Sequence, residues 1–484
     1  MVWLLSVSGI LLIVAIYDVT QRRHAILRNF PLLGHLRYWL ETVGPELRQY
    51  IVTDNNDERP FSRNQRRWVY ASAKKENDYF GFGSDMDMEL TPNYIVIKPA
   101  AVSFFDANTD ELAKKNWPIP CAKVMGSYRQ RPKAFRPSSV VNVSAMSFGS
   151  LSGAAVEAIN RGVKLAGAMQ NTGEGGISRF HNSGGDLVWQ IGTGYFGCRE
   201  ENGKFSLSRF KEAVSRFPVK AIEIKLSQGA KPGVGGMLPG IKVSREIAEA
   251  RGVARRKDCL SPSKHGSFRS TDELLDFVEL LAQESGLPVG IKSAVGEMKF
   301  WEELASLMQQ GKRGVDFITL DGGEGGTGAG PLVFTDHVAL PFTIAFSRVF
   351  RLFKEQSMDQ RIVFIGSGKL GFPERAALGF SLGCDMVNVA REALMAIGCI
   401  QAQRCHTNHC PTGIATQNRW LIRGLDPNLK SVRLANYIST LRKEISRVTF
   451  AIGHAHPSMI TGHDIEILDS NFGSRTVNEV FGYR

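Results

Sequence analysis

VDFITLDGGEGGTGAG, residues 315–330, sets the fold of this chain, because a run of apolar and β-branched residues passes directly into a glycine-rich loop. Similar apolar runs, many of them ending in glycine, recur along the middle of the chain: VVNVSAMSF (140–148), AIEIKLS (221–227), PVGIKSA (288–294), RIVFIGSG (361–368) and DMVNVARE (385–392). AMQNTGEGG (168–176) and CLSPS (259–263) are weaker examples of the same pattern. Runs of this kind, bounded by turn residues, predict eight buried β-strands when 315–322 is included.

Stretches with helical spacing separate these strands, at 241–251, 271–285, 299–310 and 372–382. Strands that alternate with helices imply a parallel sheet with right-handed crossovers. Eight such units over about 260 residues match the size of a (β/α)₈ barrel, and a doubly wound open sheet is the alternative. In a barrel, ligands bind at the carboxyl ends of the strands, where the glycines of this sequence gather.

The predicted architecture is therefore an α/β (β/α)₈ TIM barrel with an N-terminal transmembrane and helical extension and a C-terminal helical segment. We expect a transmembrane anchor over 1–17, a connector and lead-in layer over 18–138, the barrel over 139–417 and a C-terminal helical extension over 418–484.

The first 17 residues, MVWLLSVSGILLIVAIY, contain no charged side chain, and cations follow at Arg22, Arg23, His24 and Arg28. A short apolar run followed by cations predicts a single-pass anchor in a bacterial-type cell membrane, with the catalytic domain in the cytoplasm. An interfacial or core helix is the alternative. The cations that follow the apolar run account for part of the net charge of +12. The charge does not indicate nucleic-acid binding, because the sequence contains no Lys/Arg block with interleaved aromatic residues.

Three of the seven cysteines follow one another closely in the pattern Cys399-x₅-Cys405-x₄-Cys410-Pro411. Three closely spaced thiolates on one loop favour an iron–sulfur cluster, with three irons or with four and an outside ligand. Zinc is a weaker alternative because the C-x₂-C spacing is missing, and three unrelated buried cysteines are another. The other four are scattered, which indicates free thiols in a reducing compartment: Cys121, Cys198, Cys259 and Cys384.

Two glycine-rich loops, GGEGGTGAGP (322–331) and GSGKL (366–370), follow the sixth and seventh predicted strands. Backbone N–H groups in such loops, together with a helix N-terminus, can bind a phosphate. Neither loop is a Walker A motif, and no dinucleotide fingerprint opens a crossover helix. The loops therefore favour a mononucleotide such as FMN, and ordinary turns are the alternative.

A third polar region joins NTGEGG (171–176), KLSQGAKPG (225–233) and Arg251. Cations with an amide could hold a dicarboxylate, and Glu174 could position an amine or relay a proton. Taken singly, a lysine or arginine of this kind is more often a solvated surface charge.

Taken together, these segments resemble the FMN-binding synthase domain of glutamate synthases, and most closely the stand-alone glutamate synthase-like proteins. The resemblance runs in order from Ser139 to Gln417 and rests on six stretches: SAMSFGSLS (144–152), NTGEGG, KLSQGAKPGVGGMLPGIKV (225–243), GGTGAGP, GCDMVNVA (383–390) and GCIQAQRCHTNHCPTGIATQ (398–417).

The resemblance implies FMN at the barrel mouth and a [3Fe–4S] cluster on Cys399, Cys405 and Cys410. It implies four substrate-side residues: Glu174, Gln228, Lys231 and Arg251. The residues that it implies for FMN are Ser144, Ala145, Met146, Ser147, Asn171, Lys225, Gly325, Gly326, Thr327, Gly328, Gly366, Ser367 and Gly368.

The implied reaction is the reductive amination of 2-oxoglutarate to glutamate, with electrons passing through the cluster to FMN. We expect an external electron carrier (ferredoxin, a reductase subunit or quinone), and ammonia from solution or from a separate glutaminase subunit. Val234 and Met237 stand where the family has glutamate and glutamine, which puts 2-oxoglutarate in question and favours a related keto acid. A membrane-linked amino-acid or amine dehydrogenase and a non-catalytic electron relay are the alternatives.

Overall fold

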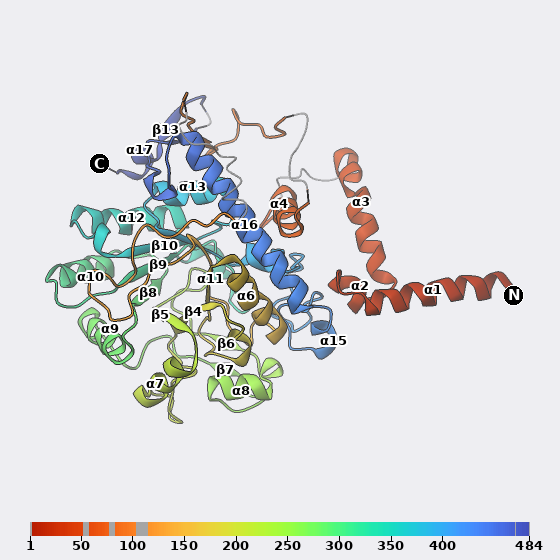
Figure 1. Cartoon of the computed structure of the whole chain (residues 1–484), viewed down its shortest axis with the longest axis horizontal. Coiled ribbons are helices and arrows are strands. Elements are labelled where there is room, and N and C mark those ends of the chain that lie inside the picture. The colour runs from red at the N-terminus through yellow and green to blue at the C-terminus, as the bar shows by residue number, and fades with distance from the viewer. Residues whose placement is uncertain (1, 52–57, 77–82, 103–114, 470, 484) are drawn as a thin grey trace.

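Eight parallel strands close into a barrel at the centre of the computed structural model, which describes residues 2–51, 58–76, 83–102, 115–469 and 471–483 (Figure 1). In chain order the barrel strands are β2 (Val141–Val143), β3 (Met169–Asn171), β4 (Asp186–Ile191), β5 (Val219–Lys225), β8 (Val289–Ser293), β9 (Phe317–Asp321), β10 (Val363–Ser367) and β11 (Met386–Val389). Each strand pairs with the next along the chain, and β11 pairs with β2 to close the ring. The predicted (β/α)₈ fold is confirmed.

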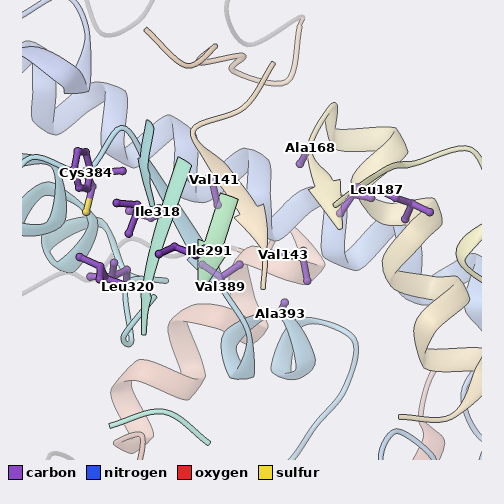
Figure 2. Packing of buried hydrophobic residues seen from close by; sticks show 14 of the residues in the cluster. Val141, Val143, Ala168, Leu187, Ile291, Ile318, Leu320, Cys384, Val389 and Ala393 are labelled. Carbon is purple, nitrogen blue, oxygen red and sulfur yellow. The ribbon is translucent and has the colours of Figure 1, made fainter. Parts of the chain in front are cut away.

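Side chains of each strand alternate between the barrel interior and the surrounding helices. In β9, Phe317 joins an interior apolar cluster, whereas Ile318 and Leu320 belong to the larger core between strands and helices (Figure 2). The interior cluster also holds Cys121 and Met125, which come from the segment that precedes the first barrel strand. That segment therefore closes one end of the barrel and leaves the carboxyl ends of the strands for a site.

Helices surround the strands, as expected for this fold (Figure 1). They are α6 (Gly153–Ala166), α7 (Leu207–Arg216), α8 (Arg245–Arg251), α9 (Thr271–Ser285), α10 (Lys299–Gln309), α11 (Leu332–His337), α12 (Phe342–Glu355), α13 (Pro373–Ser381) and α14 (Arg391–Ala396). Outside them, α16 (Pro427–Ile452) crosses α6 and also packs on α4 (Arg63–Lys74). Gly162 permits the close crossing, because a Cβ there would lie 2.8 Å from Leu434 Cδ2.

One predicted barrel strand is wrong and one barrel strand was missed. Residues 259–263 contribute only β7 (Cys259–Leu260), which pairs with β6 (Met237–Leu238) in a separate two-stranded sheet. The third barrel strand is Asp186–Ile191 instead. It was missed because the connection before it contains only the short 3₁₀ turn η1 (Arg179–His181), so the strand–helix alternation that predicts the fold is interrupted there.

The predicted membrane anchor is wrong. Within the residues that the structure describes, no helix is both long and apolar enough to cross a membrane. The apolar segment forms α1 (Val2–Thr20), which continues through Asp18. That carboxylate is fully buried, accepts the Leu32 N–H and pairs with His35 Nε2 at 2.8 Å. The last turn of α1 therefore belongs to a folded unit, and the uninterrupted apolar run before it is shorter than the ~20 residues that a span requires.

The rest of that N-terminal unit consists of α2 (Ala25–Asn29) and α3 (Leu33–Ile51). Because the anchor is wrong, the placement in a cell membrane with a cytoplasmic catalytic domain, which rested on it, is wrong as well. The expected membrane contact through the N-terminal helix likewise finds no support in the described residues.

The C-terminal part contains α15 (Arg419–Ile422), α16 and the 3₁₀ turn η4 (Pro457–Met459), followed by β12 (Ile465–Leu468), β13 (Ser474–Thr476) and α17 (Val477–Phe481). The strand β1 (Ile95–Ile97) pairs antiparallel with β12. Segments from before and after the barrel are thus joined in one small sheet.

Candidate functional site

Polar side chains gather where the barrel strands end. Lys225 is the last residue of β5 and lies in register with Lys292 of β8. Asp321 ends β9, and its carboxylate lies 3.4 Å from Lys292 Nζ and accepts the Gly229 N–H at 2.9 Å. The parallel strands therefore carry two cations and one anion to the same end of the barrel, which is where ligands bind in this fold.

A layer of hydrogen bonds lies deeper in the barrel, around Glu223, which precedes Lys225 by two residues in β5. Glu223 is almost fully buried and accepts hydrogen bonds from Asn171 Nδ2 (2.7 Å), Gln190 Nε2 (2.6 Å) and Thr319 Oγ1 (2.7 Å). Asn171 also accepts the Gly173 N–H with its Oδ1 atom. Asn171, which was expected to contact FMN, thus uses both its side-chain nitrogen and its side-chain oxygen in hydrogen bonds within the protein. These buried hydrogen bonds support the site from inside the barrel.

Glu174, Lys225 and Gln228 form the central cluster of the site. Lys225 Nζ donates to Glu174 Oε1 at 2.8 Å and to Gln228 Oε1 at 2.9 Å. Burial by itself raises the pKa of Glu174, but Lys225, with Arg251 and Lys231, holds it below its ordinary value. The carboxylate therefore stays ionised at neutral pH and can accept an N–H from a bound nitrogen compound.

Glycines let the chain pass close to this carboxylate. A Cβ on Gly192 would lie 2.7 Å from Glu174 Oε2, and one on Gly236 would lie 2.8 Å from Glu174 Oε1. Gly236 belongs to the loop in which Val234 and Met237 are 37% and 48% exposed. Two accessible apolar side chains thus belong to the loop that passes beside the ionised carboxylate.

The other two expected substrate-side cations are arranged differently. Lys231 donates to the Ala329 carbonyl at 2.5 Å, which joins its loop to the glycine loop after β9. Arg251 is buried and donates to the Phe148 carbonyl at 3.0 Å, and its guanidinium lies over the Phe196 ring. Arg251 therefore supports the backbone directly after the expected FMN segment 144–147, and its positive charge also helps to lower the pKa of Glu174.

The loop after β9 is shaped by Glu324. Its carboxylate accepts the Phe342 N–H at the start of α12, at 2.9 Å, so this helix N-terminus already has an anion. Gly368 packs directly on Phe342, since a Cβ there would lie 2.4 Å from Phe342 Cβ. Gly328, by contrast, has no atom within 3.7 Å of a Cβ built on it, the nearest being Cys405 at 3.8 Å. Gly368 is thus required for close packing against α12, whereas Gly328 leaves space for a ligand beside the loop.

Two cations border the glycine loops. Lys369 follows Gly368, and Arg391 begins α14 and donates to the Glu324 carbonyl at 2.5 Å. In the part of the chain that the structure describes, neither side chain forms an ion pair. Burial lowers the pKa of both groups. Partly buried cations without carboxylate partners, next to glycine-rich backbone, suit a phosphate.

The cysteine loop lies between the barrel and α4. Cys399 and Cys405 are partly buried, Cys410 is buried, and all three are free thiols. Burial, together with the neighbouring Cys410 and Cys405, raises the pKa of Cys399 to about 12. Within the described ranges, no group of three or more His, Cys, Asp or Glu is arranged to hold a metal ion. The expected iron–sulfur cluster is thus not shown here.

Sequence reasoning missed four charged residues of this region: Lys292, Asp321, Lys369 and Arg391. Lys292 could have been predicted as a site residue. It lies inside the apolar run PVGIKSA, and a lysine there must either extend to the barrel mouth or remain buried without a partner, which is costly. Arg391 carried none, since it stands at a predicted strand end like many surface arginines.

Comparison with known proteins agrees with the geometry. A family model described as a conserved region in glutamate synthase matches residues 108–455. The chain is 38% identical over 471 residues to the glutamate synthase large subunit-like protein YerD of Bacillus subtilis, which covers 91% of this chain and 89% of that protein. It is 32% identical over 369 residues to an archaeal glutamate synthase (NADPH) of Methanocaldococcus jannaschii, covering 76% and 68%. A ferredoxin-dependent glutamate synthase of Cyanidium caldarium is 31% identical over 350 residues, covering 68% and 22%.

Proposed function

The chain belongs to the glutamate synthase family, and from that premise we propose that it is an FMN-dependent oxidoreductase that reductively aminates 2-oxoglutarate or a related keto acid. The observation that carries this proposal is the Glu174–Lys225–Gln228 cluster at the carboxyl ends of the strands. An ionised carboxylate beside a lysine ammonium can hold both partners of a C–N bond, the nitrogen on one side and a carbonyl oxygen on the other.

The residues at the mouth fit FMN. Lys369 and Arg391, which form no ion pair among the described residues, would bind its phosphate. Lys292 and the paired hydroxyls of Ser144 and Ser367, whose oxygens are 3.5 Å apart, would contact the polar parts of the flavin. When bound and reduced by the external electron carrier, FMN would supply hydride, which is two electrons and one proton, to the carbon that carries nitrogen.

The protein's own residues would orient the substrate and manage its protons. The keto acid and ammonia first lose water to give an imine, and addition of two electrons and two protons gives the amino acid. Lys231, at the loop after β5, would hold a substrate carboxylate. Glu174 would accept an N–H of the incoming nitrogen, and the Lys225 ammonium would donate a hydrogen bond to the departing oxygen.

We also propose an iron–sulfur cluster on Cys399, Cys405 and Cys410. Its support is that burial, together with neighbouring thiols, raises the pKa of Cys399 and of Cys405. The three cysteines also share one loop, in which Cys405 lies 3.8 Å from a Cβ built on Gly328 of the glycine loop after β9. A cluster of several irons spans more widely placed thiolates than a single ion does, so the arrangement remains compatible with it. Electrons would arrive from an external carrier such as a ferredoxin or a reductase subunit.

The sequence leaves two alternative functions, a quinone-linked dehydrogenase and a non-catalytic electron relay. The quinone-linked dehydrogenase rested on a membrane helix, and no feature of the described structure now favours it. The non-catalytic relay rests on Val234 and Met237, which leave the central cluster without an additional polar partner from their loop.

The experiment that tests the proposal is amino-acid formation by the purified full chain under anaerobic conditions. Reduced methyl viologen serves as electron source, ammonium as nitrogen source, and 2-oxoglutarate and apolar 2-keto acids as parallel substrates. Formation of an amino acid that requires all three components supports the proposal. A protein that holds flavin but aminates no keto acid would instead support the relay.

A further inference from the structure

Phe61 comes from the segment that precedes the barrel and lies against the two cations at the glycine loops. It is 2% exposed. Lys369 Nζ lies 5.5 Å from the centre of its ring, and Arg391 Cζ lies 5.0 Å from it. Both distances are within the range in which an aromatic face attracts a cation. One buried ring thus contacts both of the charges that border the candidate phosphate site.

The neighbouring backbone fixes one of these cations directly. Lys369 Nζ donates to the Pro60 carbonyl at 2.9 Å. Among the described residues Glu324 forms no ion pair with either cation, and its carboxylate instead accepts the Phe342 N–H at the start of α12. Two partly buried positive charges therefore contact carbonyls and an aromatic face but, within the described residues, no directly paired carboxylate, which leaves them available for an anionic ligand.

The same segment is tied to the cysteine loop. Gln401 accepts the Phe61 N–H at 3.1 Å and donates to the Phe61 carbonyl at 3.1 Å. Further along, in α4, Tyr70 donates to the Cys399 carbonyl at 2.7 Å. The backbone of Phe61 is thus held on both of its polar atoms by a residue that lies two positions after Cys399.

This segment lies outside the family's conserved region. The family model matches residues 108–455, whereas Pro60, Phe61 and α4 precede it. The barrel mouth of this chain is therefore completed by residues that the conserved region does not supply.

We propose that Pro60 and Phe61 are positioning residues for the phosphate of FMN: they hold Lys369 and Arg391 in place beside the glycine loops and, through Gln401, join that site to the cysteine loop. The inference rests on the proposed function, because it takes FMN as the ligand. Fixing two flexible cations before the ligand arrives lowers the entropy lost on binding, and the gain applies only to a ligand that carries the phosphate.

Flavin titration of the deflavinated full chain tests this proposal, with FMN and riboflavin as the two probes. Phe61→Leu keeps an apolar side chain but removes the aromatic face. We expect its Kd for FMN to rise about tenfold, equivalent to about 1.4 kcal/mol. The Kd for riboflavin, which lacks the phosphate, should be unchanged.

Phe210→Leu is the matched control, because Phe210 is also a fully buried ring but stacks on Trp189 on the outer side of the barrel. Its preference for FMN over riboflavin should equal that of the wild type. Gln401→Ala serves as a second variant if Phe61→Leu folds poorly, and it should also reduce the preference.

An unchanged preference in both Phe61→Leu and Gln401→Ala would overturn the proposal, as would an equal loss in Phe210→Leu. If the wild-type chain binds neither flavin, the proposed function fails as well. If the wild type binds FMN and the variants bind it equally well, only the positioning role fails.

Discussion

Lys225 Nζ lies 2.8 Å from Glu174 Oε1, although the two residues are 51 positions apart and are positioned by different barrel strands. Lys225 ends β5, and Glu174 lies in the loop that follows β3. The ion pair is partly shielded from solvent, with side-chain exposures of 11% and 17%. Gln228 accepts a second hydrogen bond from the same ammonium, so the lysine is fixed by two partners at once.

Replacing the acid should abolish catalysis without removing the flavin. In Glu174→Gln the amide cannot hold a positive nitrogen compound as a carboxylate does, and we expect kcat to fall about 100-fold or more. Flavin content, measured from the absorption spectrum, should stay at the wild-type level. Glu249→Gln is the control, since that residue pairs with Arg245 on the solvent-exposed face of α8 and should keep full activity. Wild-type turnover in Glu174→Gln would remove the residue from the mechanism.

Replacing Val234 and Met237, the two residues at which the substrate loop differs from the family, should change which keto acid the enzyme prefers. Met237→Gln, alone and with Val234→Glu, restores the polar side chains that the family has at these positions. We expect kcat/KM for 2-oxoglutarate to rise about tenfold relative to an apolar 2-keto acid of similar length. Competition assays with both substrates in one mixture give this ratio directly. A ratio that does not move would show that this loop does not select the substrate.

Single cysteine replacements should separate the three loop thiols from the others. Cys399→Ser, Cys405→Ser and Cys410→Ser should each lower bound iron and acid-labile sulfide, because each removes one proposed thiolate ligand. Cys121→Ser is the matched control, since Cys121 is buried in the interior cluster at the other end of the barrel. Iron content that is the same in all four variants, or absent from the wild type, would contradict the cluster.

Lys430 provides a pH-dependent test of stability. It is 2% exposed, and burial, with Arg433 and Lys74 nearby, lowers its pKa from 10.5 to about 7. A lowered lysine pKa means that the folded state disfavours the proton, so this cost is fully present below pH 7 and disappears as the pH rises from about 7 to 10.5. Lys430→Met should therefore stabilise the protein below pH 7 by up to about 5 kcal/mol, since the pKa is lowered by about 3.5 units at about 1.4 kcal/mol per unit.

Denaturant unfolding at pH 6.5 and pH 9.5 measures this effect. The gain in the free energy of unfolding should be large at the lower pH and small at the higher one. A gain of the same size at both values would mean that packing around the methionine, rather than the charge, is responsible.

The barrel was predictable because most of its strands alternate with helices, and many pass directly into glycine-rich loops, as residues 315–330 do. β4 was missed because no helix precedes it, so periodicity could not separate Asp186–Ile191 from a loop. The apolar N-terminal run was misread for a related reason. Hydropathy alone cannot show that Asp18 is buried against His35, a partner 17 positions away.

The site was predictable where a motif places residues close together in the chain, as in Lys225 and Gln228. Partnerships across long sequence separations were not. Arg251 could be placed near the site from its motif, but nothing local showed that its guanidinium supports the Phe148 carbonyl. The contact of Phe61 with Lys369 and Arg391 joins residues more than 300 positions apart, and no spacing rule could indicate it.

The central claim, an FMN-dependent reductive amination, is tested most directly by the absorbance of the protein's own flavin. The full chain is purified anaerobically, its flavin is reduced, and 2-oxoglutarate and ammonium are added separately and together. The account predicts rapid return of the oxidised flavin spectrum only when a keto acid and ammonium are both present, with an apolar 2-keto acid tested in parallel because of Met237. A reduced flavin that no keto acid with ammonium reoxidises, or a chain without any flavin spectrum, would contradict it.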